Sequence, residues 1–175
     1  MRHKKHLGQN FLVDKNIINK IIKHINLNKD DYILEIGPGD GALTKYISSA
    51  VTGLIIIEKD NSLIDGLYTI LKNHKNAKIH NIDVLKFNFS SIKYRIRIVG
   101  NLPYNISTEI IFKLCNTENI IDMHFMLQKE VVDRIISKPN NKVYGRLTVM
   151  AQTYFNIKKL FDVSENVFLP KPKVK

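Results

Sequence analysis

Three glycines after an apolar run mark the first place in this sequence that could bind a small molecule. Gly37, Gly39 and Gly41 form a G-x-G-x-G turn, and glycine lets the backbone pass close to a ligand. Dinucleotide sites use G-x-G-x-x-G, which is absent here. Glu35 and Asp40 add negative charge, so the turn favours a cationic ligand over a phosphate. Taken alone, the glycines fit an ordinary tight turn equally well.

Two acidic residues follow the next two apolar runs. Glu58 lies 21 residues after Gly37, close to the spacing of about 20 at which a carboxylate accepts hydrogen bonds from ribose hydroxyls. Asp83 follows the next run and could accept a hydrogen bond from the amine of an adenine ring. Either residue could instead be a solvated loop charge or a helix cap. Together with the glycine turn they predict an adenosine-containing ligand that needs no phosphate contacts.

The tetrapeptide Asn101-Leu102-Pro103-Tyr104 is the most specific signal. Asn101 offers an amide oxygen, Pro103 fixes the backbone so that neighbouring carbonyls point one way, and Tyr104 offers a ring face. This arrangement suits a flat group that carries an NH2. A proline turn with a packed tyrosine is the alternative.

Alternating strands and helices must position these residues. Apolar runs at 32–36, 54–57, 78–80, 95–99 and 123–127 predict strands, and helical spacing predicts helices over 42–50, after Asp60 or Ser62, over 107–114 and around 131–136. Isoleucines 17 to 25 behind Asp14 predict a first amphipathic helix. This order indicates an α/β fold with a mostly parallel sheet and helices on both faces. Ligands then bind beyond the carboxyl ends of the strands, where the unusual residues lie.

Composition limits the class of protein. A chain of 175 residues with 44% hydrophobic residues fits one globular domain, and a net charge of +11 favours a polyanionic partner, although coding bias toward lysine also contributes. The lone Cys115 excludes an internal disulfide and is expected to pack in the core. No apolar run approaches the ~18 residues of a membrane span, so a soluble, unexported protein is expected. A mitochondrial presequence would compete with this reading, but the basic start lacks serine.

These residues resemble the ribosomal RNA adenine N6-dimethyltransferases, and the small-subunit branch of that family most closely. The similar stretches are LGQNFL at 7–12, 35–44, Glu58, Asp83, 101–108, MLQKEVV at 126–132, YGRLTVMAQ at 144–152 and FLPKPKV at 168–174. The macrolide-resistance methylases of large-subunit RNA share the glycine turn and the Asn-x-Pro-Tyr pattern. The runs MLQKEVVDRI and YGRLTVMAQ favour the small-subunit branch.

The resemblance implies a Rossmann-like methyltransferase fold, S-adenosyl-L-methionine as cofactor, no metal, and a role for each residue. Asn10 and Leu12 close the cofactor pocket, Gly37, Gly39 and Gly41 pass beneath the methionine part, Glu58 holds the ribose, Asp83 holds the adenine amine, and Asn101 lies between cofactor and target base. Asn101 and the Leu102 carbonyl would hold the target amine within the catalytic turn that Pro103 and Tyr104 complete. Tyr104 and Phe168 would stack on the two faces of an extruded adenine.

The same resemblance implies a cytoplasmic enzyme that dimethylates two adjacent adenosines near the 3′ end of small-subunit (16S-type) ribosomal RNA. Its partner would be that RNA within a pre-30S-type particle, and the protein would be a monomer with no membrane contact. Residues 1–175 would be the catalytic domain without the family's C-terminal helical domain, which leaves a sheet edge open. Candidates for phosphate contacts are Lys4, Lys5, Lys93, Arg95, Arg97, Lys171, Lys173 and Lys175.

Three alternatives stay open at this point. The chain could be a non-catalytic RNA-binding assembly factor on an inherited methylase fold, although pure binding does not need Asn101 or Tyr104. It could be a large-subunit methylase that confers macrolide resistance. A small-molecule or DNA amine methylase would share the Asn-x-Pro-Tyr chemistry, but the net charge of +11 argues against a small-molecule substrate.

Overall fold

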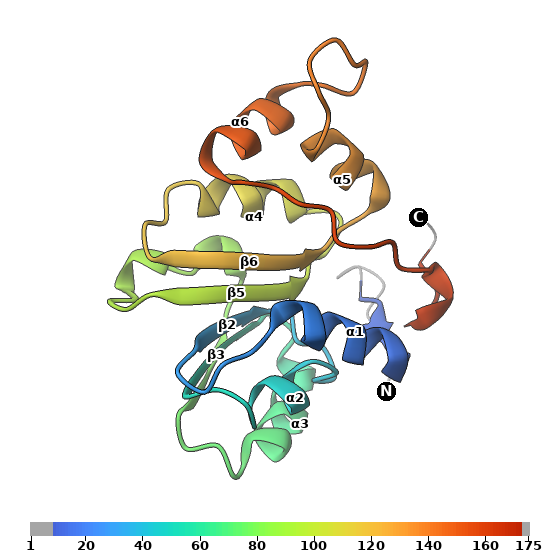
Figure 1. Cartoon of the computed structure of the whole chain (residues 1–175). Coiled ribbons are helices and arrows are strands. Elements are labelled where there is room, and N and C mark those ends of the chain that lie inside the picture. The colour runs from blue at the N-terminus through green and yellow to red at the C-terminus, as the bar shows by residue number, and fades with distance from the viewer. Residues whose placement is uncertain (1–8, 173–175) are drawn as a thin grey trace.

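A five-stranded parallel sheet forms the centre of the computed structural model, which describes residues 9–172 (Figure 1). The strands are β2 (Tyr32–Ile36), β3 (Gly53–Glu58), β4 (Ala77–Asn81), β5 (Ile96–Asn101) and β6 (Ile120–Met126). Their spatial order is β4-β3-β2-β5-β6, and all four pairings are parallel. The chain moves outward from β2 to β4 and then crosses to β5. Strand order therefore reverses between β2 and β5, and a ligand crevice is expected at their carboxyl ends.

One face of the sheet is covered by α1 (Lys15–Ile25), α2 (Thr44–Ile47) and α3 (Asn61–Leu71). Asp14 caps α1 as predicted, because its side chain accepts a hydrogen bond from Ile17 N at 3.0 Å. The helix predicted over 42–50 is shorter than expected: only α2 is helical, with turns on either side. Ser49 Oγ donates to the Tyr46 carbonyl at 3.1 Å, and such local bonds compete with helix propagation.

The other face is covered by η2 (Val84–Lys86), η3 (Phe89–Ser91) and α4 (Ser107–Leu114). Outside α4 lie α5 (Lys129–Ile135) and α6 (Arg146–Tyr154), which form a third small core with it. Cys115 ends α4, and its Sγ lies 3.4 Å from the Ile111 carbonyl. Helices therefore cover both faces, as predicted.

The two ends of the described chain meet beside the sheet. β1 (Phe11–Leu12) pairs antiparallel with β7 (Phe168–Leu169), which follows η4 (Glu165–Val167). Val13 N also donates to the Val167 carbonyl at 2.9 Å. Between α6 and η4 the chain runs past β6 without regular structure (Figure 1). Within residues 9–172, β6 pairs only with β5.

Arg97 forms a buried ionic cluster at the amino end of β5. Its guanidinium donates two 2.8 Å bonds to Asp122 and one 2.7 Å bond to Asp31, and it also reaches the last carbonyls of α1. Burial alone would raise the pKa of Asp122, but bonds from His124 and Arg97 outweigh it and lower that pKa to about 2. Arg97 is 8% exposed, so the prediction that it contacts phosphate is wrong. It joins α1 to the sheet instead.

Candidate functional site

A large cavity opens at the carboxyl ends of the strands, where the sheet topology predicts one. It has a volume of about 1550 Å³ and continues from the ends of β2, β3 and β5 along β6 to the segment 155–165. Among the predicted site residues, the cavity is lined by Asn10, Gly37, Gly39, Glu58, Asp83, Asn101, Leu102, Pro103, Tyr104 and Phe168. Leu12 and Gly41 are not among its lining residues.

The glycine turn after β2 needs glycine for two different reasons. Gly37, Gly39 and Gly41 have φ of 64°, 61° and 82°, which other residues rarely adopt. A Cβ on Gly39 would lie 2.8 Å from a ring atom of Phe11, so the missing side chain makes room for β1. A Cβ on Gly41 would instead collide with Ile70 of α3. Gly41 thus serves helix packing, while Gly37 and Gly39 face the cavity.

Glu35 lies beneath this turn and does not face the cavity. Its side chain is fully buried and accepts a 2.8 Å hydrogen bond from the Thr44 hydroxyl. Burial raises the pKa of Glu35 to about 7, and the Thr44 bond opposes part of that rise. At neutral pH this carboxyl is therefore partly protonated. The negative charge of the corner comes less from Glu35 than the sequence predicts.

Glu58 ends β3 with its carboxylate on the cavity wall. Its Oε1 accepts from Asp60 N at 2.7 Å, and its Oε2 accepts from Gly39 N at 3.4 Å. Burial raises the pKa of Glu58, and these backbone donors counteract the rise. A carboxylate can accept about four hydrogen bonds. Glu58 therefore keeps capacity for a pair of ligand hydroxyls while its backbone bonds fix its direction.

Asp83 follows β4 and is held from two sides. Its Oδ1 caps η2 by accepting from Leu85 N at 2.9 Å, and its Oδ2 accepts from Lys59 Nζ at 2.8 Å. The Lys59 bond is the main reason that the pKa of Asp83 is lowered. Asp83 stays ionised and can accept a further bond from an amine in the cavity.

The turn after β5 carries the catalytic candidates. Asn101 Nδ2 donates to the Asn10 carbonyl at 3.1 Å, which leaves Oδ1 as the amide atom available to the cavity. Ile106 N donates to the Pro103 carbonyl at 3.2 Å, so a tight turn joins the tetrapeptide to α4. The Tyr104 side chain is 46% exposed. An unburied ring at a cavity rim is consistent with stacking rather than core packing.

Of the predicted site residues in and beside β1 and β7, some line the cavity and one is buried in the core. The Leu12 side chain is buried in the core beneath α1, next to Ile18 and Ile21, so any contact it makes with a ligand would come from its backbone. Phe168 pairs with Leu12 in the β1–β7 ladder, is half-buried, and lines the cavity. Asn10 lines it as well. Phe168 and Tyr104 therefore border the same cavity.

Three contributors were missed at the sequence level. Phe11 lines the cavity and packs on Gly39. Lys59 pairs with Asp83, and Gln9 donates to Asp60 Oδ2 at 2.7 Å. A usable signal existed for Lys59, because it directly follows the strand end at Glu58. Nothing local marked Phe11, whose role depends on a strand formed with residues 168–169.

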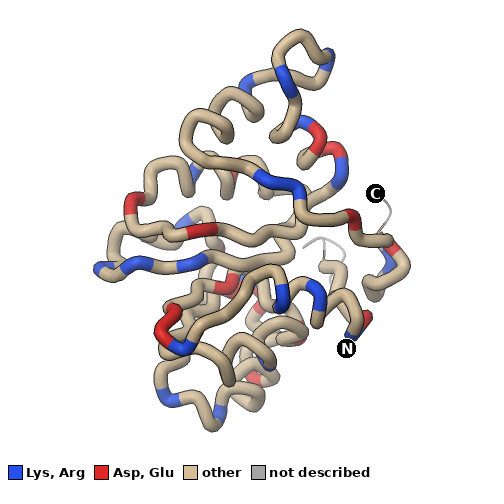
Figure 2. Tube along the Cα trace, viewed as in Figure 1, with Lys and Arg blue, Asp and Glu red and all other residues tan. Residues whose placement is uncertain are grey.

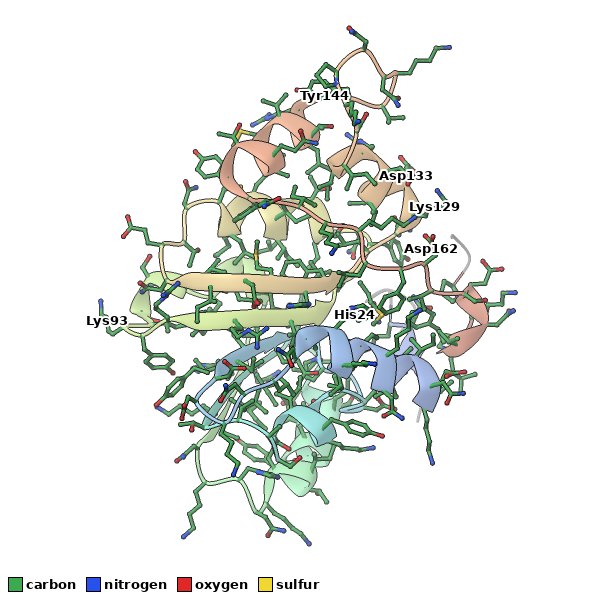
Figure 3. All side chains as sticks on the ribbon, viewed as in Figure 1. His24, Lys93, Lys129, Asp133, Tyr144 and Asp162 are labelled. Carbon is green, nitrogen blue, oxygen red and sulfur yellow. The ribbon has the colours of Figure 1, made fainter. Side chains whose placement is uncertain are left out.

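Lys and Arg positions are distributed along the described trace rather than gathered in one segment (Figure 2). Near the cavity several are already paired: Lys129 with Asp133 at 2.6 Å and Lys159 with Asp162 at 2.8 Å. Lys129, Asp133 and Asp162 lie on one side of the molecule, while Lys93 projects from the opposite end of the sheet (Figure 3). Of the other phosphate candidates, Arg95 is exposed and Lys171 pairs with Glu165 at 3.1 Å. Lys4, Lys5, Lys173 and Lys175 lie outside the described residues.

The site fits S-adenosylmethionine on its own geometry. At Gly37 the nearest atom to the place of a side chain is the Asn101 carbonyl oxygen, at 3.8 Å, so this part of the turn is open to the cavity. Two fixed carboxylates, Glu58 and Asp83, follow successive strands. These acceptors match ribose hydroxyls and an adenine amine. Within the same range no cluster of three or more His, Cys, Asp or Glu could hold a metal ion. Over these residues, no helix is both long and apolar enough to cross a membrane.

Known proteins match nearly the whole chain. The family model of ribosomal RNA adenine dimethylase matches residues 1–175. The ribosomal RNA small subunit methyltransferase A of Francisella tularensis subsp. novicida is 48% identical over 98% of this chain and 67% of its own length. A dimethyladenosine transferase from Plasmodium falciparum superposes with a TM-score of 0.85 at 29% identity, over 94% of this chain and 60% of that one. The 23S rRNA methyltransferase ErmE superposes with a TM-score of 0.79 at 29% identity, over 94% of this chain and 66% of its own.

Proposed function

The chain belongs to the ribosomal RNA adenine dimethylase family, whose members dimethylate ribosomal RNA adenines with S-adenosylmethionine as methyl donor, and we propose that its own target is small-subunit RNA. The product would be N6,N6-dimethyladenosine at two adjacent positions near the 3′ end of that RNA. The 48% identity to a small-subunit methyltransferase supports this choice over a large-subunit target. Residues 1–175 would be the catalytic, cofactor-binding part of the enzyme.

One observation supports the proposal: Asn101 lines the same cavity as Glu58 and Tyr104, and the Asn10 carbonyl engages its Nδ2, which leaves its Oδ1 as the acceptor. The N6 amine of adenine is a poor nucleophile, because its lone pair is delocalised into the ring. Asn101 Oδ1 and the Leu102 carbonyl can accept hydrogen bonds from the two N6 hydrogens. Those bonds would favour a pyramidal nitrogen and direct its lone pair toward the donor.

Each remaining residue has a binding role. Glu58 would hold the ribose hydroxyls and Asp83 the adenine amine of S-adenosylmethionine, while the backbone of Gly37 and Gly39 would pass beneath its methionine part. S-adenosylmethionine supplies an electrophilic methyl group on a positively charged sulfur. Tyr104 and Phe168 would hold the extruded target adenine by stacking, worth about 1–3 kcal/mol per base. No strong base is needed if the proton leaves N6 after transfer.

The setting of the reaction belongs to the same proposal. The partner would be small-subunit RNA within a pre-30S-type particle, and the enzyme would act in the cytoplasm as a monomer. A net charge of +11 supports a polyanionic partner. Because Lys129 and Lys159 near the cavity are paired with acidic residues, we propose that phosphates would be contacted by basic residues from several directions rather than through one groove.

Calorimetric titration with S-adenosylmethionine, followed by methyl incorporation into undermethylated small subunits, tests the proposal. We expect binding and incorporation, and we expect Asn101→Ala to lower incorporation by about 100-fold or more while most cofactor affinity remains. Asn19→Ala is the matched control, because it removes the same amide from an exposed position on α1 that does not line the cavity. It should stay within about twofold of the wild type.

Three other outcomes would contradict parts of the proposal. Incorporation into large subunits in place of small ones would favour the macrolide-resistance class. Cofactor binding without any incorporation would favour a non-catalytic assembly factor. Full turnover by Asn101→Ala would overturn the amine-holding role.

A further inference from the structure

A side-chain hydrogen bond joins the segment at β1 to the catalytic turn. Asn101 Nδ2 donates to the backbone carbonyl of Asn10 at 3.1 Å, across 91 residues of sequence. An asparagine amide can rotate by 180° and exchange its oxygen and nitrogen, and only one of the two orientations presents an acceptor to an amine. The Asn10 carbonyl favours that orientation, because it accepts only from the nitrogen.

The position of the Asn10 carbonyl depends in turn on β1. Asn10 directly precedes β1, whose Phe11 and Leu12 pair with Leu169 and Phe168. The next residue, Val13, extends the ladder by donating to the Val167 carbonyl at 2.9 Å. Phe11 packs where a side chain on Gly39 would be, and Leu12 is buried beneath α1. These contacts fix the carbonyl relative to both the cofactor turn and the catalytic turn.

We propose that the β1–β7 ladder is a positioning element for methyl transfer, which sets the orientation of the Asn101 amide through the carbonyl of Asn10. The inference rests on the proposed role of Asn101 in holding the target amine. It adds a requirement that does not follow from the cofactor and base contacts alone: β1 must pair with β7 for the enzyme to turn over. Phe168, which belongs to the same ladder, would be placed beside the target base by the same event.

Val13 allows the ladder to be weakened without touching the site. Its side chain is 50% exposed, and its N–H makes the Val167 bond. Val13→Pro removes that donor, and the extended residue before a proline is compatible with Leu12 in a strand. Val13→Ala keeps the donor and removes both valine methyl groups, so it measures the effect of losing the side chain alone. The pair therefore isolates the ladder bond.

The first readout is the side-chain NH2 signal of Asn101 in an amide NMR spectrum, identified by its loss in Asn101→Asp. In the wild type and in Val13→Ala we expect a shifted, slowly exchanging hydrogen. In Val13→Pro we expect the signal to move toward that of a free amide. The second readout is the kcat for methyl transfer to undermethylated small subunits. It should fall by about 10- to 100-fold in Val13→Pro, as expected when a catalytic group is misplaced by about 1 Å, and stay within about twofold in Val13→Ala.

A second pair keeps the test decisive if Val13→Pro does not fold. Leu169 lies opposite Phe11 in β7 and is 57% exposed. Leu169→Gly weakens the strand, whereas Leu169→Thr keeps a strand-forming residue at the same place. The glycine variant should show the same changes in the amide signal and in kcat, and the threonine variant should not.

Two results would overturn the inference. One is a displaced Asn101 amide with normal kcat, and the other is a reduced kcat with an unchanged amide signal. Failure of the proposed function would look different, since the wild type would then lack methyl transfer while its Asn101 amide signal still responded to Val13→Pro.

Discussion

Glu35 gives the protein a pH-dependent stability that one substitution should remove. Burial raises the pKa of its carboxyl from the usual 4.5 to about 7. An unfolded chain releases this proton near pH 4.5, whereas the folded chain keeps it up to about pH 7. The folded state therefore binds more protons between these values, and stability falls as pH rises across that window. Below pH 4.5 and above pH 7 this group contributes no slope.

The expected size of the effect follows from the two pKa values. Each unit of pKa is worth about 1.4 kcal/mol, so ionising Glu35 in the folded state costs about 3 kcal/mol. Glu35→Gln keeps an oxygen that can accept from the Thr44 hydroxyl and removes the ionisation. We expect the variant to be more stable than the wild type at pH 8 by up to about 3 kcal/mol, relative to the difference between them at pH 4.5.

Urea denaturation of both proteins at half-unit steps from pH 4.5 to 8 measures this difference. Thr44→Val is an informative second variant, because the Thr44 hydroxyl supports the ionised form. Its loss should raise the pKa of Glu35 further and extend the decline above pH 7. Parallel stability profiles for the wild type and Glu35→Gln would refute the reasoning. They would mean that Glu35 ionises in the folded protein as easily as in water.

Two further predictions concern the buried cluster and the ribose site. Arg97→Met should lower the free energy of unfolding by about 2–4 kcal/mol, since it leaves the Asp31 and Asp122 carboxylates without their partner. The exposed Arg95→Met is its control and should change stability by less than about 0.5 kcal/mol in the same urea titration; equal losses would contradict the cluster. Glu58→Gln should weaken S-adenosylmethionine binding by about 10- to 100-fold by calorimetry, and an unchanged affinity would show that the ribose lies elsewhere.

Much of the sheet could be predicted because each strand is a short apolar run followed by a chemically distinctive turn. The helix over Ser107–Leu114 and the caps at Asp14 and Asp60 agree with the sequence pattern. In these elements the information is local. A buried strand and its flanking helices each show a hydrophobic pattern in their own sequence, whatever the rest of the fold is.

Arg97 shows where local information ends. In sequence it is one of several basic residues around 93–97, and its charge suggested a surface role. Its partners lie 66 and 25 residues away, at Asp31 and Asp122. No pattern around Arg97 records either contact. Only the pairing of β5 with β6 on one side and with β2, which Asp31 precedes, on the other brings the three charges together.

Two-residue strands also cannot be predicted from the sequence, because their pairing depends on distant residues. β1 and β7 are too short to show any alternation, so neither could be predicted. The three glycines present the opposite problem, because they look alike in sequence and all have positive φ. Gly39 makes room for Phe11 and Gly41 makes room for α3, and that division depends on what packs beside each one.

The hydrogen bonds that fix Glu58, Asp83 and Asn101 explain why the catalytic turn depends on β1 and β7. Glu58 and Asp83 are fixed before any ligand arrives, by bonds to groups no more than 24 residues away. Preorganised acceptors of this kind lose little freedom on binding. Asn101 differs, because its amide is fixed by a carbonyl 91 residues away. Loosening the β1–β7 ladder should therefore reduce cofactor binding less than methyl transfer. Methyl transfer depends on the orientation of the Asn101 amide, which the distant Asn10 carbonyl sets.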